Sequence, residues 1–231
     1  MRHASFIAEL GILACLWLAG WGVAFWLIRK GITYVENYLI TSLAFLSFSA
    51  LLVVSFGRRY EPLTRNPTAL PFLVLLLAVV VTIALYAVCP RYFKRPDALI
   101  AKHPEEFYLR MDYRYLVSKS FEVLFQQLVI VALTLLLAAT GLTRTGIVLA
   151  FLVLFGLLHL PMLRVIGGGL GIYYTIASAT LAVVFPLLIL RVHYGFVYSY
   201  AAHWFSYMLA GALAWGLYNG TTRRGRVGST G

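Results

Sequence analysis

Long apolar stretches separated by short polar ones make up most of this chain of 231 residues. A membrane-spanning helix needs about 20 mainly apolar residues, and backbone in lipid must satisfy its own hydrogen bonds, which favours helices. The alternation typical of barrel strands does not occur in the sequence. We therefore predict an all-α, polytopic transmembrane helix bundle of about seven spans, at residues 6–28, 38–56, 70–89, 121–142, 146–163, 170–190 and 194–218.

Composition supports a membrane protein without a separate soluble domain. Hydrophobic residues make up 61% of the chain and charged residues 12%, whereas a soluble domain carries about 25% charged residues. We predict a single integral membrane domain over residues 1–220. Residues 90–120 would form an interfacial loop and residues 121–218 the half that carries the sequence motifs, and a disordered tail would follow at 221–231.

The net charge of +11 gives the predicted topology. Of the 19 Lys and Arg residues, six fall on the side of the N-terminus and thirteen on the side of the C-terminus. The positive-inside rule then places the N-terminus outside and the C-terminus in the cytoplasm. We predict membrane lipid as a partner and the cytoplasmic membrane of a prokaryote as the location. Nucleic acid is excluded, because no basic surface interleaved with aromatic residues is present.

Cysteine chemistry contributes little. The two cysteines, Cys15 and Cys89, lie in or beside apolar stretches and show no Cys-x-x-Cys or Cys/His spacing. A disulfide framework or a structural zinc site is therefore not expected. We predict no metal and no cofactor.

Three titratable residues fall inside the later predicted spans or at their mouth: Glu122, His159 and His203. A charged side chain at the centre of a membrane helix costs about 2.5–3.5 kcal/mol, so such groups normally face the bundle interior. Together they form a plausible acid–base set. Purely structural alternatives stay open. Glu122 would be a carboxylate at a helix N-terminus, His159 would contact lipid headgroups, and His203 would be a packed core histidine.

Each of these residues shares a helix face with a neighbour four positions away. The neighbours are Gln126, Phe155 and Tyr207. They are the predicted supporting residues of the site.

Three motifs follow one another in the last spans: FEVLFQQ at 121–127, FGLLH at 155–159 and HWFSY at 203–207. In this order they resemble the CAAX-protease and bacteriocin-processing family of intramembrane endopeptidases. The motifs of that family are Glu-Glu-x-x-x-Arg, Phe-x-x-x-His and His-x-x-x-Asn (or Asp). The resemblance implies that Glu122, His159 and His203 activate water and stabilise the oxyanion of a peptide substrate near the membrane.

The chain departs from the family motifs at three positions. Phe121 stands in place of the first glutamate, Gln126 in place of the arginine, and Tyr207 in place of the asparagine. The loss of the first glutamate favours an alternative, a catalytically inactive relative that acts as a membrane scaffold or binding partner.

A second segment also fits the first motif of the family. The sequence EEFYLR supplies Glu105, Glu106 and Arg110 in full agreement with Glu-Glu-x-x-x-Arg. It lies in a polar loop, whereas the family motif begins a membrane helix, so it is the alternative first motif.

The leading hypothesis is therefore a glutamic-type intramembrane endopeptidase that cleaves a membrane-proximal peptide or protein, such as a prenylated C-terminus, a leader peptide or a sorting peptide. A Glu-His-His zinc site ranks lower, since His-Glu-x-x-His is absent. A transporter ranks third, because the first three spans are too apolar.

Overall fold

The computed structural model describes residues 3–66, 68–102, 107–165 and 168–227, and these residues form helices and no strands. This confirms the predicted all-α class. The elements are α1 (His3–Arg29), α2 (Tyr38–Thr64), α3 (Ala69–Tyr92), α4 (Asp97–Lys102), the 3₁₀ helix η1 (Phe107–Arg110), α5 (Tyr113–Ala139), α6 (Arg144–Phe151), the π-helical turn η2 (Leu152–Gly156), α7 (Leu157–His159), α8 (Met162–Val165), α9 (Gly168–Arg191) and α10 (Gly195–Val227).

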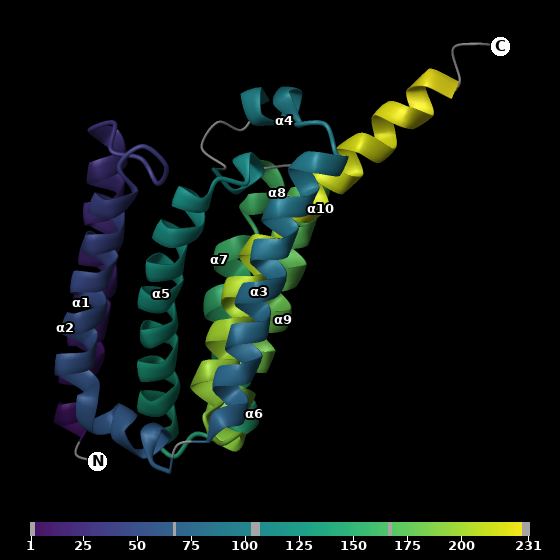
Figure 1. The fold of residues 1–231 in the computed structure, drawn as a ribbon. Helices are drawn as coiled ribbons and strands as arrows, with labels where there is room; N and C mark the ends of the chain where they lie inside the picture. The colour runs from purple at the N-terminus through teal and green to yellow at the C-terminus, as the bar shows by residue number, and fades with distance from the viewer. Residues whose placement is uncertain (1–2, 67, 103–106, 166–167, 228–231) are drawn as a thin grey trace.

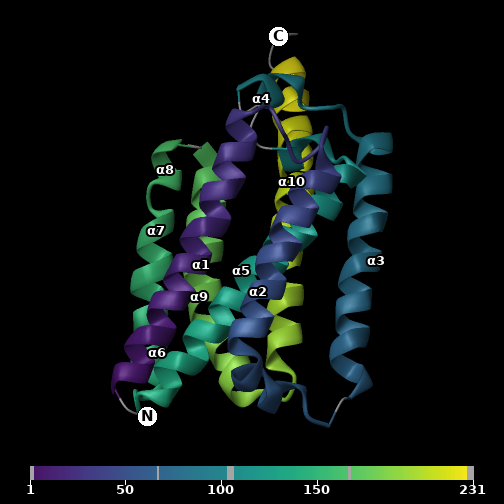
Figure 2. The ribbon, with the colours of Figure 1, turned by 90° about the vertical axis from the view of Figure 1, so that its left-hand side faces the viewer.

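Helix α5 occupies the centre of the bundle. It packs against α1 and α2 on one side and against α9 and α10 on the other, as Figure 1 shows. Helix α3 and the short helices α7 and α8 lie at opposite edges (Figure 2). In the most apolar window of α5, 56% of residues are buried, compared with 33% or less in the other long apolar helices. Side chains on α5 are therefore the best placed to face an interior site.

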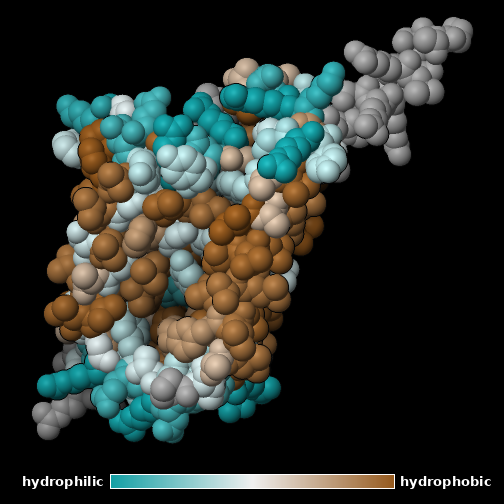
Figure 3. Space-filling model, viewed as in Figure 1, coloured by the Kyte–Doolittle hydropathy of each residue, from teal (hydrophilic) through white to brown (hydrophobic). Residues whose placement is uncertain are grey.

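Five helices are long and apolar enough to cross a membrane: Ser5–Arg29, Tyr38–Thr64, Ala69–Tyr92, Tyr113–Ala139 and Gly171–Arg191. The face of the molecule drawn in Figure 3 carries a broad hydrophobic region between two polar ends. Both observations fit an integral membrane protein in contact with lipid. The number of seven spans stays a prediction: the predicted span 146–163 is divided among α6, η2, α7 and α8, and α10 does not reach the apolarity of the five.

Helix α5 begins eight residues earlier than predicted, at Tyr113 instead of residue 121. Asp112 caps it, because its side chain accepts a hydrogen bond from the backbone N–H of Arg114 at 2.9 Å. Glu122 therefore lies in the third turn of the helix, away from the first-turn position that the helix-dipole alternative requires.

Helical segments occupy much of the described part of the predicted loop 90–120 and part of the predicted tail. Most of the described loop residues belong to the end of α3, to α4, to η1 and to the start of α5. The indole of Trp215 on α10 donates to the carbonyl of Leu109 in η1 at 2.6 Å, which ties this region to the bundle. Helix α10 continues to Val227 and so covers residues 221–227, where the sequence favoured disorder.

Candidate functional site

A cavity of about 660 Å³ lies among α1, α5, α6–α7, α9 and α10. The three titratable residues selected from the sequence, which come from three different helices, all line it, as do all three predicted supporting residues: Glu122, His159, His203, Gln126, Phe155 and Tyr207. The remaining walls are mainly aromatic and aliphatic. The structure thus brings these six positions to one cavity, and their chemical role stays a prediction.

The carboxylate of Glu122 is almost completely buried and is held by donors from its own helix. Its Oε1 accepts a bond from Lys119 Nζ at 2.5 Å and another from Gln126 Nε2 at 2.7 Å. The exposed fraction of the side chain is 3% for Glu122 and 11% for Lys119. This is a buried ion pair with an additional amide donor, which keeps the carboxylate in one orientation.

Sequence reasoning missed Lys119. Because the prediction began this helix at residue 121, Lys119 fell in the interfacial loop and counted only as topological charge. The signal that could have found it is the spacing Lys119-x-x-Glu122, which puts both side chains on one face once the helix is extended. The ammonium of Lys119 also lies 3.9 Å from the centre of the Tyr207 ring on α10, a cation–π contact.

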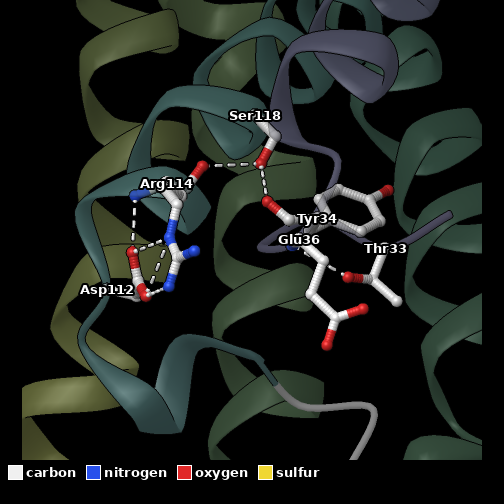
Figure 4. Close-up of polar contacts among 6 residues, drawn as sticks. All are labelled: Thr33, Tyr34, Glu36, Asp112, Arg114 and Ser118. Atoms are coloured by element: carbon white, nitrogen blue, oxygen red, sulfur yellow. Dashed lines mark hydrogen bonds and ion pairs between the residues drawn. The ribbon is translucent and has the colours of Figure 1, made fainter.

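A second missed residue, Tyr34, comes from the loop between α1 and α2. Ser118 on α5 donates its hydroxyl to the backbone carbonyl of Tyr34 at 2.7 Å, and Figure 4 shows this contact beside the Asp112–Arg114 cap. Burial, followed by the negative charge of the neighbouring Glu122, raises the pKa of the Tyr34 hydroxyl well above its usual value. Tyr34 therefore keeps its proton and can donate it in a hydrogen bond to the carboxylate.

The imidazole of His203 is buried and its orientation is fixed by a chain of hydrogen bonds. Ser199 donates its hydroxyl to the carbonyl of Phe196 at 2.9 Å, so its oxygen is available to accept from Gln127 Nε2 at 2.6 Å. Gln127 Oε1 then faces His203 Nδ1 at 3.2 Å. Because a carbonyl oxygen only accepts, Nδ1 carries the proton, and Nε2 of the neutral ring is an acceptor.

His159 has the same tautomer for the same reason. Its Nδ1 lies 2.6 Å from the backbone carbonyl of Phe155, so Nδ1 donates and Nε2 can accept. Phe155 belongs to the π-helical turn η2 and stacks on Phe151 with ring centres 5.2 Å apart. Turns of this kind are frequent at functional sites.

Tyr207 contacts both His203 on its own helix α10 and Lys119 on α5. Its ring lies 5.5 Å from that of His203 and 6.1 Å from that of Tyr174 on α9, and Lys119 stands over its face. Tyr207 thus places an aromatic ring against the cation of the buried ion pair.

The alternative first motif receives no support from the cavity. Glu105 and Glu106 lie outside the described residues, and Arg110, at the end of η1, is not among the residues that line the cavity. For a metal, three or more suitable side chains would have to converge; no such group of His, Cys, Asp or Glu is found in the described part of the chain.

The cavity thus offers a carboxylate, two imidazoles with accepting Nε2 atoms, and donors from a lysine, a tyrosine and an amide. Comparison of the chain with models of known protein families, with curated proteins and with solved structures finds no match in any of the three.

Proposed function

We propose that this protein is a glutamic-type intramembrane endopeptidase that hydrolyses a peptide bond of a membrane-proximal peptide or protein. One observation carries the proposal: the three titratable positions that the motifs select, on α5, α7 and α10, line a single cavity of about 660 Å³. If His203 were only a packed core histidine and His159 only a headgroup contact, these three side chains would not need to line one cavity.

The proposed reaction uses Glu122 as the general base. A water oxygen would bond to the peptide carbonyl carbon while one water proton passes to the carboxylate. The C–N bond then breaks, and Glu122 returns the proton to the leaving nitrogen. His159, through its accepting Nε2, would position the attacking water.

The hydrogen-bond directions change the part that His203 plays in this proposal. A neutral ring with its proton on Nδ1 cannot donate from Nε2 to an oxyanion. We therefore propose that neutral His203 is a second acceptor for the water and that the oxyanion receives its hydrogen bonds from Lys119 and the Tyr34 hydroxyl. Donors of this kind stabilise the charge that develops in the transition state.

The proposed setting is a seven-span protein of a prokaryotic cytoplasmic membrane with its N-terminus outside. The start of α5, with Lys119 and Glu122 in its early turns, lies at the same end of the bundle as the C-terminus (Figure 1). The positive-inside rule assigns that end to the cytoplasm, so the substrate bond would be cut near the cytoplasmic surface.

The test compares peptide termini in membranes that contain the wild type, Glu122→Gln or His203→Ala, using mass spectrometry. Matched controls are Glu61→Gln and His193→Ala, whose side chains are exposed and do not line the cavity. We expect termini that depend on Glu122 and His203 and are unchanged in both controls. If no terminus depends on either cavity residue, the protease proposal is wrong.

A second candidate is a peptide-binding membrane scaffold without catalytic activity. The observation that favours it is the ion pair itself, because Glu122 Oε1 already accepts from Lys119 and Gln126. A photo-crosslinker at Phe155 in the cavity wall would distinguish the two. A scaffold would yield the same intact crosslinked peptide in the wild type and in Glu122→Gln, whereas a protease would accumulate it only in the variant.

A further inference from the structure

The cavity contains a single Lys or Arg among its described lining residues, and that residue is Lys119. It is 9% exposed and belongs to the same face of α5 as Glu122. Both ends of the side chain are fixed: the backbone by the helix, and the ammonium by the Glu122 carboxylate at 2.5 Å and the Tyr207 ring at 3.9 Å. A flexible surface lysine has none of these constraints.

A carboxylate in such a cavity needs a nearby cation to stay ionised. Transfer of an unpaired charge into an apolar environment is so costly that the group neutralises instead. The other titratable or amide groups that line the cavity are the hydroxyls of Tyr34, Tyr115, Tyr173, Tyr174 and Tyr207, the amide of Gln126, and the imidazoles of His159 and His203. Both imidazoles hold their Nδ1 proton on a carbonyl oxygen and offer an acceptor at Nε2, so in their neutral form they bring no positive charge.

We propose that Lys119 is a positioning residue that keeps Glu122 ionised and aims its carboxylate into the cavity. The proposal rests on the function proposed above, in which Glu122 must be charged to accept a proton from water. Gln126, on the other side of Glu122, donates a hydrogen bond but no charge. The cation therefore comes from the preceding turn of α5, and Tyr207 on α10 holds it in place.

The charge of Glu122 can be measured without a substrate. The full chain, reconstituted in bilayers, is examined by infrared spectroscopy for the carbonyl stretch of a protonated carboxyl group as a function of pH. The band of Glu122 is identified by its loss in Glu122→Gln. At neutral pH the wild type should show no such band, and Lys119→Met should show one that is absent from the double variant Lys119→Met/Glu122→Gln.

Conservative replacement separates charge from packing. Lys119→Arg keeps a cation and should again lack the protonated band at neutral pH, although its geometry differs. A band of Glu122 in the neutral wild type, or the absence of a band in Lys119→Met across the neutral range, would overturn the proposal. If Lys119→Met fails to fold while the double variant folds, the cause is the burial of the Glu122 carboxyl group without its cation, which supports the proposal.

The same variants distinguish this inference from the proposed function. If Lys119 sets the charge of Glu122, the cleavage rate of Lys119→Met should rise with pH into the alkaline range, while staying below that of the wild type because the oxyanion has lost one donor. Lys119→Arg keeps a cation and should therefore keep the pH profile of the wild type. If the infrared bands appear as expected but neither the wild type nor any variant cleaves a peptide, the protease proposal is refuted and the role of Lys119 stands. Cleavage by Lys119→Met with the pH profile of the wild type would refute the role of Lys119 alone.

Discussion

Helix α1 approaches the side chain of Phe125 on α5 closely at Gly20. A Cβ atom at Gly20 would lie 2.5 Å from Phe125 Cζ and 3.0 Å from Cε1. Ordinary carbon–carbon contacts are about 3.5–4.0 Å, so the substitution Gly20→Ala creates an overlap of about 1 Å.

Phe125 cannot easily relieve this overlap. Its side chain is 0% exposed, and its ring is flanked by Phe45 and Phe48 with centres 5.9 and 6.0 Å away. Forcing extra atoms into a well-packed core costs about 1–3 kcal/mol. Replacing glycine by alanine within a helix stabilises the fold by up to about 1 kcal/mol, because alanine has the higher helix propensity.

Gly22 provides a matched control on the same helix, since a Cβ atom there meets no atom within 4 Å. The gain from helix propensity is common to both substitutions and cancels in the comparison. We therefore expect Gly20→Ala to be less stable than Gly22→Ala by about 1–3 kcal/mol, the overpacking cost alone.

Equilibrium unfolding in mixed micelles, followed by circular dichroism, measures both variants on one scale. Combining Gly20→Ala with Phe125→Leu should recover part of the loss, with a coupling of about 0.5–3 kcal/mol. Equal stability of the two alanine variants, or additive effects in the double variant, would refute the close packing of α1 on α5 and with it the position of α1 as a cavity wall.

Three further effects follow from individual contacts. Ser199→Ala leaves the buried amide donor of Gln127 without its acceptor and should cost about 1–3 kcal/mol in unfolding free energy, whereas the exposed Ser47→Ala should change it by less than about 0.5 kcal/mol. Equal losses of unfolding free energy in Ser199→Ala and Ser47→Ala would contradict the hydrogen-bond chain from Ser199 through Gln127 to His203. The Arg114 guanidinium holds the pKa of Asp112 below its usual range. The ion pair therefore stabilises the fold above the pKa of the unfolded state, and this contribution is lost as pH falls through the folded pKa. Asp112→Asn, which keeps a capping side chain, should thus lose about 0.2–1 kcal/mol at neutral pH, and the difference should vanish in acid; a constant difference across pH would exclude the charge as its origin. Arg59 contacts both carboxylate oxygens of Glu9 across α1 and α2, so a double-mutant cycle of Arg59→Met and Glu9→Gln should give a coupling of about 0.5–3 kcal/mol, and no coupling would mean that the pair does not tie the two helices.

Helix α9 is among the helices whose bounds the sequence predicted closely. Helix α9 spans Gly168–Arg191, within two residues of the predicted 170–190. The start of α5 was predicted eight residues too late, because Arg114 and Lys119 were taken as loop charges. In the structure the first is paired with Asp112 and the second is buried against Glu122. A charged residue can lie within an apolar helix when an oppositely charged residue pairs with it within one turn. A hydropathy profile does not detect such pairs.

Only those site residues that belong to a local sequence motif could be predicted. Glu122, His159 and His203 each belong to a recognisable short pattern, so their selection needed only the sequence. Tyr34 belongs to no motif and reaches the cavity through a loop whose carbonyl is held by Ser118, 84 positions later in the chain. Contacts of this kind depend on how α5 packs beside α1 and α2, which no single-sequence pattern specifies.

The directions of the hydrogen bonds restrict what the cavity can hold. Stability is a weak reason for this cluster, because hydrogen bonds between membrane helices average only about 0.6 kcal/mol. Fixed Nδ1 protons leave His159 and His203 as acceptors, while Lys119 and Gln126 are donors. An occupant that satisfies both sets must itself present a donor and an acceptor close together in an otherwise apolar body. A hydrocarbon chain has neither, whereas a peptide group with a water molecule has both. The arrangement of protons thus favours an occupant with hydrogen-bond donors and acceptors over the acyl chain of a lipid, independently of any reaction at Glu122.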